Sequence, residues 1–363
     1  MPNLRGGGAE RLHLNLANYW IKMGFNVEFI LMRKEGELVT LVAPEVTFVD
    51  LNVGRIRSAV IPLLLHMFKS KSQVILVAMW PLTLIAIFSW FLTGRRGKLF
   101  VSDHENLSLS YEKLYQGNLT LIKKSIEFSY PLASGIIAVS RGVKQDLCLL
   151  GNLPENLVCV INNPAATGIF FKRETKEVQD QLWGSDFEYH ILSVGRLAPE
   201  KNHASLINAF ALLPKALKPK LIILGEGPSR SSLEALVKQL DLEESVSLPG
   251  FMIDPYPWFR SADLFVLSSL WEGFGNVIVE ALECGLPVIS TDCPGGPAEI
   301  LDYGRFGKLV PVNDPSMLAE AMLGNLASSH NSVALMRRAE DFSLDKISNE
   351  YISYFFPENK LSV

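Results

Sequence analysis

The stretch Trp-Glu-Gly-Phe-Gly-Asn-Val-Ile-Val-Glu-Ala-Leu, residues 271–282, is the most informative part of this chain. Gly273 and Gly275 allow the backbone to turn tightly and to approach a ligand closely. From Asn276 onward, the spacing of apolar side chains predicts a buried helix. The unpaired N–H groups and the positive dipole end of this helix face the turn, so together they form a binding site for a diphosphate.

Two carboxylates flank this predicted anion site. Glu272 lies ahead of the helix and can reach hydroxyls beyond the anion, whereas Glu280 lies two turns into the helix and can reach hydroxyls on the other side. A ligand with a central diphosphate and polyols at both ends is a nucleotide-sugar. The alternative is an ordinary helix entry with Glu280 as a solvated surface charge.

A second group of polar residues lies upstream, in Ser-Val-Gly-Arg-Leu-Ala-Pro-Glu-Lys-Asn at residues 193–202. Residues 190–194 form a predicted buried strand, and a helix is expected from about His203. Arg196 and Lys201 therefore lie in a loop at the carboxyl end of a strand, which is where open α/β sheets bind ligands. Arginine can fork onto phosphate oxygens and lysine can place a point charge there, although both could be solvated loop cations.

Strand-like runs alternate with helical patterns along the whole chain, which predicts an α/β fold with two doubly wound, parallel domains. The linker is expected between residues 162 and 175, where Pro164 breaks regular structure and a charged run follows. Eleven strands are expected, at residues 26–32, 46–49, 74–79, 99–101, 135–139, 157–160, 191–194, 221–224, 246–248, 264–267 and 288–290.

In combination, these segments resemble glycosyltransferase family 4, a family of retaining enzymes with the GT-B fold. The stretch G-R-L-x-x-E-K-N at residues 195–202 and the stretch E-G-F-G-N-x-x-x-E at residues 272–280 carry the resemblance. Further similarity lies in G-E-G-P at 225–228, L-P-G-F at 248–251, A-D-L-F-V-L-S at 262–268, G-L-P-V-I at 285–289 and P-G-G-P-A-E-I at 294–300. The resemblance covers nearly the whole chain and is densest from residue 191 to residue 310.

The resemblance implies two Rossmann-like domains that face a central cleft. We expect an acceptor-side domain at residues 1–165, a nucleotide-sugar domain at residues 175–340, and a C-terminal helix at residues 341–363 that crosses back to the first domain. The family normally begins with an apolar strand, whereas here residues 1–4 lead directly into a glycine loop. We therefore expect that the first strand is absent. A misassigned start, a truncated chain, or residues 1–4 filling only part of the gap would each explain this, and a missing upstream segment is the preferred interpretation.

The resemblance also assigns roles to residues that the first two motifs leave open. His104 follows a predicted strand and would face the donor sugar, with Asp103 as the alternative. In the loop before the first helix, Gly7 and Gly8 would approach the diphosphate or the acceptor. Further donor contacts would come from Gly227, Phe251, Gly273, Phe274, Gly275 and Asn276.

Composition narrows the class of protein. The net charge of −4 gives no basic field that would suggest nucleic acid as a partner. The four cysteines form no C-x-x-C pair, which favours reduced thiols in a cytoplasmic protein. Histidines are scattered and no metal site or cofactor is expected; two cations and a helix N-terminus can supply the charge that Mg²⁺ supplies elsewhere.

One long apolar stretch, residues 74–92, needs to be considered as a membrane span. Pro81 divides it, so a strand, a turn and a helix are the preferred interpretation. Basic residues flank the stretch on both sides. They leave open a peripheral contact with an anionic membrane surface through Lys69, Lys71, Arg95, Arg96 and Lys98.

These observations predict a retaining glycosyltransferase that moves a hexose or N-acetylhexosamine from a nucleotide-sugar to a glycan or lipid-linked glycan acceptor, in cell-surface polysaccharide or glycolipid synthesis. UDP is the expected nucleotide because it is the common donor in the family. Arg196 and Lys201 would stabilise the leaving diphosphate, Glu272 would hold sugar hydroxyls, and Glu280 would bind the ribose. The alternative is an inactive partner subunit that binds sugar nucleotides.

Overall fold

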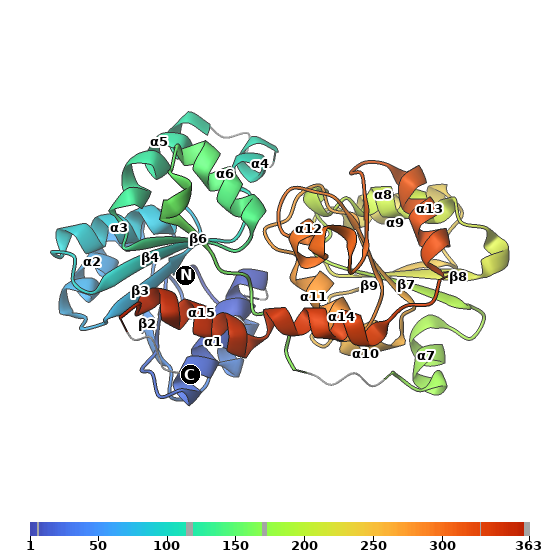
Figure 1. Cartoon of the computed structure of the whole chain (residues 1–363), viewed down its shortest axis with the longest axis horizontal. Coiled ribbons are helices and arrows are strands. Elements are labelled where there is room, and N and C mark those ends of the chain that lie inside the picture. The colour runs from blue at the N-terminus through green and yellow to red at the C-terminus, as the bar shows by residue number, and fades with distance from the viewer. Residues whose placement is uncertain (6, 114–118, 169–172, 327, 359–363) are drawn as a thin grey trace. The chain divides into compact units, whose positions relative to one another are not determined.

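The computed structural model describes residues 1–5, 7–113, 119–168, 173–326 and 328–358, and it divides into two compact units (Figure 1). Unit 1 comprises Met1–Pro164 together with Leu344–Val363, and unit 2 comprises Ala165–Ser343. The chain thus enters unit 2 once, directly after Pro164, and returns to unit 1 for its last helix.

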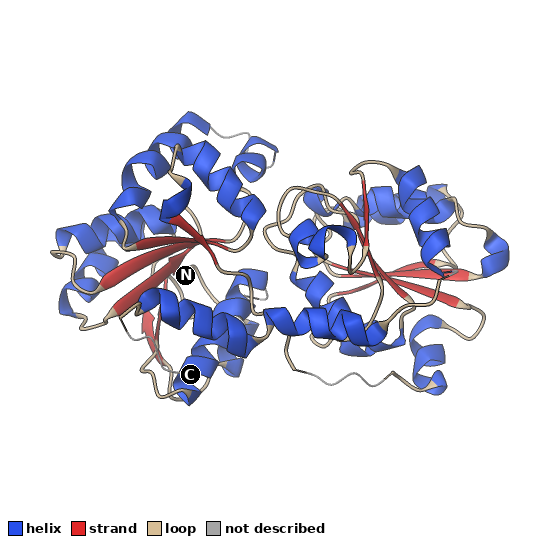
Figure 2. Cartoon of the chain, viewed as in Figure 1, coloured by secondary structure: helices blue, strands red, loops and turns tan. Residues whose placement is uncertain are grey.

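Unit 1 contains parallel strands in two separate sheets, with helices on both sides (Figure 2). One sheet pairs β1 with β2, and the other has the order β3-β4-β5-β6. The strands are β1 (Glu28–Leu31), β2 (Thr47–Asp50), β3 (Val74–Ala78), β4 (Lys98–Asp103), β5 (Gly135–Ala138) and β6 (Val158–Val160). The helices are α1 (Gly8–Lys22), α2 (Val60–Lys69), α3 (Leu82–Leu92), α4 (Leu107–Lys113), α5 (Leu119–Ser129), α6 (Arg141–Gly151) and α15 (Leu344–Phe355).

The last helix, α15, packs into the core of unit 1. Tyr351 and Phe355 are buried and lie against Trp20 of α1, with ring centroids about 6 Å apart. The Trp20 indole also donates a hydrogen bond to Ser348 Oγ at 2.8 Å. The apolar face of α15 therefore covers one side of the β3–β6 sheet, next to α1.

The first residues of the chain lie beside β1. The Met1 amino group donates to Ile30 O at 2.9 Å, and the Leu4 N–H donates to Glu35 O at 2.9 Å. Leu4 is fully buried in the core that surrounds β1. Among the described residues no strand precedes α1, and β1 and β3 belong to different sheets.

Unit 2 is built on one six-stranded parallel sheet with the order β12-β11-β10-β7-β8-β9. Its strands are β7 (Tyr189–Val194), β8 (Pro219–Leu224), β9 (Val246–Gly250), β10 (Leu264–Leu267), β11 (Val288–Thr291) and β12 (Lys308–Val310). Its helices are α7 (Lys176–Trp183), α8 (His203–Ala211), α9 (Arg230–Gln239), α10 (Tyr256–Ser261), α11 (Asn276–Glu283), α12 (Pro297–Ile300), α13 (Pro315–Leu326) and α14 (Ser332–Ala339). The chain starts at β7, adds strands on one side, and then returns to add β10 on the other side.

Each of the eleven expected strands is present, with ends that differ by a few residues. The twelfth, β12, was not predicted because it has only three residues, which start with the exposed Lys308 and are followed by a proline. The apolar stretch at 74–92 is β3 followed by α3, as expected. No helix among the described residues has the length and apolar character that crossing a membrane requires. All four cysteines are unpaired.

Candidate active site

The strand order of unit 2 brings together the two loops that carry the predicted site residues. β7 and β10 are neighbours in the sheet although the chain visits β8 and β9 between them. The loops that follow these two strands therefore meet at the point where the strand order reverses, the usual ligand-binding position in such sheets. They are also tied directly, because Leu270 N–H donates to Glu200 O at 2.7 Å and Ser268 Oγ donates to Lys201 O at 2.9 Å.

Lys201 and Glu272, predicted separately from two motifs, form an ion pair at this point. Lys201 Nζ lies 2.6 Å from Glu272 Oε1, and the same oxygen accepts a hydrogen bond from Ser269 Oγ at 2.6 Å. Glu272 is buried. Burying a carboxylate costs free energy unless it is paired, and Lys201 and Ser269 provide the partners of Glu272. Sequence reasoning missed Ser269; its position directly after β10 was the available signal.

Arg196 lies in the same loop as Lys201, and its side chain is exposed. The carbonyl oxygens and N–H groups of this loop bond to the next loop, since Gly195 N–H donates to Leu224 O and Leu197 N–H donates to Glu226 O, both at 2.9 Å. The backbone is therefore fixed while the guanidinium group remains accessible to an anion.

Three glycines allow neighbouring loops to touch through their backbones. Gly225 has φ +144°, and a Cβ atom there would collide with the carbonyl oxygen of Gly195; a Cβ at Gly227 would collide with the carbonyl of Leu197. On the other side of the switch point, Gly295 has φ +129° and abuts the carbonyl of Glu272. Only glycine fits such contacts, so Gly227 has a packing role in addition to any contact with a donor.

The turn before α11 has the predicted form. Gly275 has φ +102° and is the residue before the helix, which begins at Asn276 as expected. Gly273 lies in the turn itself. Phe274 is buried against Phe342, with ring centroids 5.4 Å apart, so its side chain anchors the turn and leaves only its backbone available to a ligand. Glu280 is half-buried on α11.

Phe251 follows β9 and is about half exposed. The preceding residue, Gly250, accepts a hydrogen bond from Gly225 N–H at 2.8 Å, which places Phe251 next to the glycine loop after β8. An exposed aromatic side chain at a strand end is available for contact with a flat base.

In unit 1, His104 follows the carboxyl end of β4 and lies against His13 of α1, with ring centroids 5.1 Å apart. His104 Nε2 lies 3.1 Å from Ser102 Oγ, whereas its Nδ1 and the Nε2 of His13 are buried without a hydrogen-bond partner. Burial lowers the pKa of His13 to about 4 and holds the pKa of His104 well below its usual value. Both rings are therefore neutral at pH 7 and can exchange hydrogen bonds with hydroxyls.

Asp103, the alternative to His104, is the last residue of β4 and is almost fully buried. Burial raises its pKa to about 7, although a hydrogen bond from Tyr130 acts in the opposite direction. Sequence reasoning missed His13. The available signal was a polar residue at a buried position of α1, between Leu12 and Leu14.

Gly7 and Gly8 begin α1, and Gly6 lies outside the described residues. A Cβ atom at Gly7 would collide with the carboxylate of Glu10, which therefore lies against the start of the helix. Burial raises the pKa of Glu10. A diphosphate at this end would meet a carboxylate, so the loop suits an uncharged hydroxyl ligand better than an anion.

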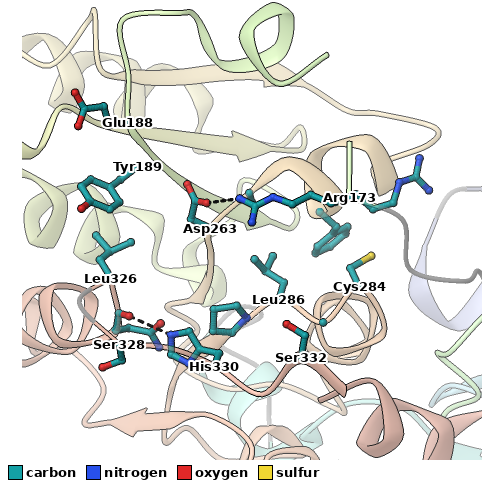
Figure 3. A pocket seen from close by; sticks show the side chains of 16 residues that line it. Arg173, Glu188, Tyr189, Asp263, Cys284, Leu286, Leu326, Ser328, His330 and Ser332 are labelled. Atoms are coloured by element: carbon teal, nitrogen blue, oxygen red, sulfur yellow. Dashed lines mark hydrogen bonds and ion pairs between the residues drawn. The ribbon is translucent and has the colours of Figure 1, made fainter. Parts of the chain in front are cut away.

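A hollow of about 340 Å³ lies elsewhere in unit 2 (Figure 3). Tyr189, Asp263 and Pro287 line it at the amino-terminal ends of β7, β10 and β11. Arg173 closes part of it through an ion pair with Asp263 at 2.8 Å. It is thus at the opposite edge of the sheet from Lys201 and Glu272, and the carboxyl-terminal edge is the better candidate site. Among the described residues, no group of three or more His, Cys, Asp and Glu could hold a metal ion.

Comparison with known proteins gives the family. Residues 175–341 match the family Glycosyl transferases group 1, and residues 6–167 match Glycosyltransferase Family 4. The chain is 33% identical over 266 residues to an N-acetylgalactosamine-N,N'-diacetylbacillosaminyl-diphospho-undecaprenol 4-alpha-N-acetylgalactosaminyltransferase of Campylobacter jejuni, a match that covers 72% of this chain and 70% of that protein. It is 28% identical to an N-acetyl-alpha-D-glucosaminyl L-malate synthase of Bacillus anthracis, over 64% of this chain and 61% of that one.

Solved structures of other proteins resemble this chain over nearly its whole length. Sucrose-phosphate synthase from Thermosynechococcus elongatus superposes with a TM-score of 0.82 at 20% identity, covering 99% of this chain and 95% of that one. Anabaena Alr3699/HepE in complex with UDP superposes with a TM-score of 0.77 at 21% identity, covering 97% and 99%. These likenesses establish the GT-B fold that the sequence predicted. The chain is a glycosyltransferase and belongs to glycosyltransferase family 4, the group 1 glycosyl transferases.

Proposed function

We propose that the enzyme transfers a hexose or N-acetylhexosamine from a UDP-sugar, with retention of configuration, to a glycan or lipid-linked glycan acceptor. The observation that carries this proposal is the Lys201–Glu272 pair at the switch point of unit 2, beside the turn that opens α11. Two kinds of comparison support it. A structure of the same fold holds UDP, and the Campylobacter jejuni relative is named for transfer to a diphospho-undecaprenol-linked sugar.

In this proposal the donor diphosphate lies between the first turn of α11 and the cations of the β7 loop. Arg196 is exposed and can fork onto phosphate oxygens, while Lys201 contributes a point charge. Both stabilise the negative charge that develops on the leaving diphosphate, so the transition state gains more than the ground state.

The ion pair gives Glu272 a second role. When a diphosphate approaches, it competes with Glu272 for Lys201, and the carboxylate becomes available to hydroxyls of the donor sugar. Ser269 still donates to Glu272 and limits the cost of losing the cation. Glu280 then binds the ribose hydroxyls from the other side of the helix start, and Phe251 contacts the base.

Unit 1 contributes neutral groups. His104 and His13 offer ring nitrogens without protein partners, which suit the hydroxyls of a sugar. Gly7 and Gly8 contribute backbone groups to acceptor recognition. No residue of the site is assigned as a covalent nucleophile; the acceptor attacks from the side on which the diphosphate leaves.

The proposed acceptor class also implies a place of action. A lipid-linked glycan is held at a membrane, so we expect the enzyme to work on the cytoplasmic face of one, as a peripheral protein. Cell-surface polysaccharide or glycolipid synthesis is the corresponding process.

Thermal stabilisation by nucleotides tests the donor site. We expect UDP to raise the Tm of the full chain, with and without Mg²⁺, more than GDP, ADP or NAD⁺ does. Glu280→Ala should lose the shift, whereas Glu320→Ala on the exposed side of α13 should keep it. The anomeric configuration of the product, read by NMR, tests retention. A UDP shift that Glu280→Ala leaves intact would contradict the ribose assignment.

A further inference from the structure

Helix α2 of unit 1 is apolar on two faces, but the fold buries only one of them. Leu63 and Met67 are buried against unit 1. Ile61, Leu65 and Phe68 are exposed, and their spacing of four and three residues places them on one face of the helix. The solvent side of a surface helix is normally polar.

Helix α3 repeats this pattern and packs beside α2. It buries Ala86, Ile87 and Trp90 and exposes Phe88, Phe91 and Leu92. The six exposed side chains of the two helices, each 50% to 67% exposed, form what we call the α2–α3 face: Ile61, Leu65, Phe68, Phe88, Phe91 and Leu92. Single exposed apolar residues are ordinary, whereas a group of large ones on adjoining helices indicates an interaction surface.

Cations connect the two helices and border the α2–α3 face. The Arg96 guanidinium lies 5.1 Å from the centroid of the Phe68 ring and donates a hydrogen bond to Phe68 O at 3.0 Å. The Arg95 guanidinium lies 4.9 Å from the centroid of the Phe91 ring. The end of α3 is therefore fixed to the end of α2, and both arginines remain exposed.

The charge of this region has one sign. Residues 51–102 contain seven Lys and Arg and no Asp or Glu, in a chain whose net charge is −4. Lys69 and Lys71 lie at the end of α2 that Arg96 contacts, and Arg55 and Arg57 precede its other end. There, a shallow hollow of about 560 Å³ is lined by Arg55, Ile56, Arg57, Pro81, Leu84 and Ile85. Outside this region, Glu28 of β1 pairs with His66 of α2.

We propose that the α2–α3 face docks unit 1 onto an anionic lipid bilayer. Large apolar side chains with cations at both ends match the boundary between acyl chains and negatively charged headgroups. With 10 and 11 residues the two helices are too short to span a bilayer, so they lie in its surface. Residues 51–102 carry no acidic side chain, so a second copy that packed through the same face would bring like charges together, which favours a bilayer over a symmetric dimer. Docking through this face extends the proposed membrane contact. It rests on the proposed function, because a lipid-linked acceptor would hold the enzyme's substrate at a membrane. No donor-site residue belongs to the α2–α3 face.

Vesicle sedimentation of the full chain tests the proposal. Wild type should bind vesicles that contain phosphatidylglycerol, bind pure phosphatidylcholine weakly, and lose binding as salt rises. Leu65→Glu with Phe91→Glu should weaken binding at least about tenfold, because two charges enter the apolar face. Lys69→Glu with Lys71→Glu should weaken binding to phosphatidylglycerol by about tenfold or more while keeping the apolar face intact.

A matched control is available on α6. Leu149 is 81% exposed, also in unit 1, and Leu149→Glu should bind vesicles as wild type does. Melting curves confirm that each variant is folded. Equal binding by wild type and both double variants, or no binding to phosphatidylglycerol, would overturn the proposal. So would a concentration-dependent dimer that only Leu65→Glu with Phe91→Glu abolishes, since it assigns the face to a second copy.

The same variants separate this inference from the proposed function. UDP stabilisation should be unchanged in both double variants, because the donor site lies in unit 2. Vesicle binding that depends on the α2–α3 face in a chain that no nucleotide stabilises would uphold the surface and contradict the proposed function.

Discussion

The carboxyl ends of the strands in the two units carry different kinds of polar group. In unit 2, a lysine and a buried carboxylate stand 2.6 Å apart between loops whose backbones touch through glycines. In unit 1, the corresponding position holds two neutral histidines and Asp103, whose pKa burial raises to about 7. One end is built from paired charges and the other from groups that burial keeps uncharged or nearly so.

This difference indicates a division of chemical work. Paired charges can exchange partners with an incoming anion, and they gain most when charge develops in a reaction. Neutral ring nitrogens offer directional hydrogen bonds without attracting an anion, which suits hydroxyls. The contrast thus supports the assignment of the diphosphate to unit 2, and it can be tested by removing each part in turn.

The largest effect should follow from Lys201→Met. Removing one group that stabilises developing charge costs about a hundredfold to a thousandfold in rate, so kcat/KM should fall by that factor. The measurement is initial rates with the donor that stabilises the wild type best. Lys218→Met is the matched control, because Lys218 is an exposed lysine that also pairs with a glutamate, at 2.8 Å.

The same substitution leaves Glu272 buried without its cation, which should lower the free energy of unfolding by about 3 kcal/mol. Combining Lys201→Met with Glu272→Gln should restore most of the stability without restoring activity. Recovery of activity in the double variant would contradict the role of Lys201, since its effect would then have been structural.

The next effect should come from Gly295→Ala. This residue has φ +129°, and a Cβ atom there meets the carbonyl of Glu272. Backbone strain and overpacking should together reduce the free energy of unfolding by about 3 kcal/mol, measured in urea. Gly304 also has a positive φ, +102°, but nothing lies within 4 Å of the added atom. Gly304→Ala should therefore lower the free energy of unfolding by only about 1 kcal/mol. An equal decrease in both variants would show that backbone strain, and not the collision with Glu272, causes the effect of Gly295→Ala.

Sequence predicted unit 2 better than unit 1 for a physical reason. Strand, turn and helix follow one another locally in unit 2, so the helix start at Asn276 and the loop position of Arg196 could be predicted from apolar spacing and glycines. The Lys201–Glu272 pair could not, because it depends on β7 and β10 becoming neighbours across a crossover. The motifs supplied both residues but not the contact.

In unit 1 the sequence supplied His104 but not its environment. His13 comes from α1, some ninety positions away along the chain, and nothing in the spacing of α1 indicates that it meets β4. The Glu10 carboxylate at the start of α1 was missed for a different reason: the glycines suggested an anion site, while the acidic residue that fills it lies within the helix itself. The roles proposed for Gly7, Gly8 and His104 stay predictions.

The smallest effect, and the one that most sharpens the comparison, is the pH dependence carried by His13. Its pKa is about 4 in the folded chain, below the ordinary value of 6.5, because burial disfavours the charged ring; the hydrogen bond with Ala9 O raises the pKa, and the Met1 amino group lowers it. As pH falls below 6.5, the His13 ring takes up a proton in the unfolded chain before it does so in the folded chain. The free energy of unfolding therefore decreases between pH 6.5 and pH 4. At pH 5 the decrease is about 2 kcal/mol.

Urea unfolding at pH 7.5 and at pH 5 measures this decrease. His13→Phe should reduce the difference in unfolding free energy between the two pH values by about 2 kcal/mol. His330→Phe, at an exposed position, should leave the difference unchanged. A gap that His13→Phe does not narrow would mean that water or a counter-charge reaches the ring, and unit 1 would then resemble the charged site of unit 2 more than a neutral one.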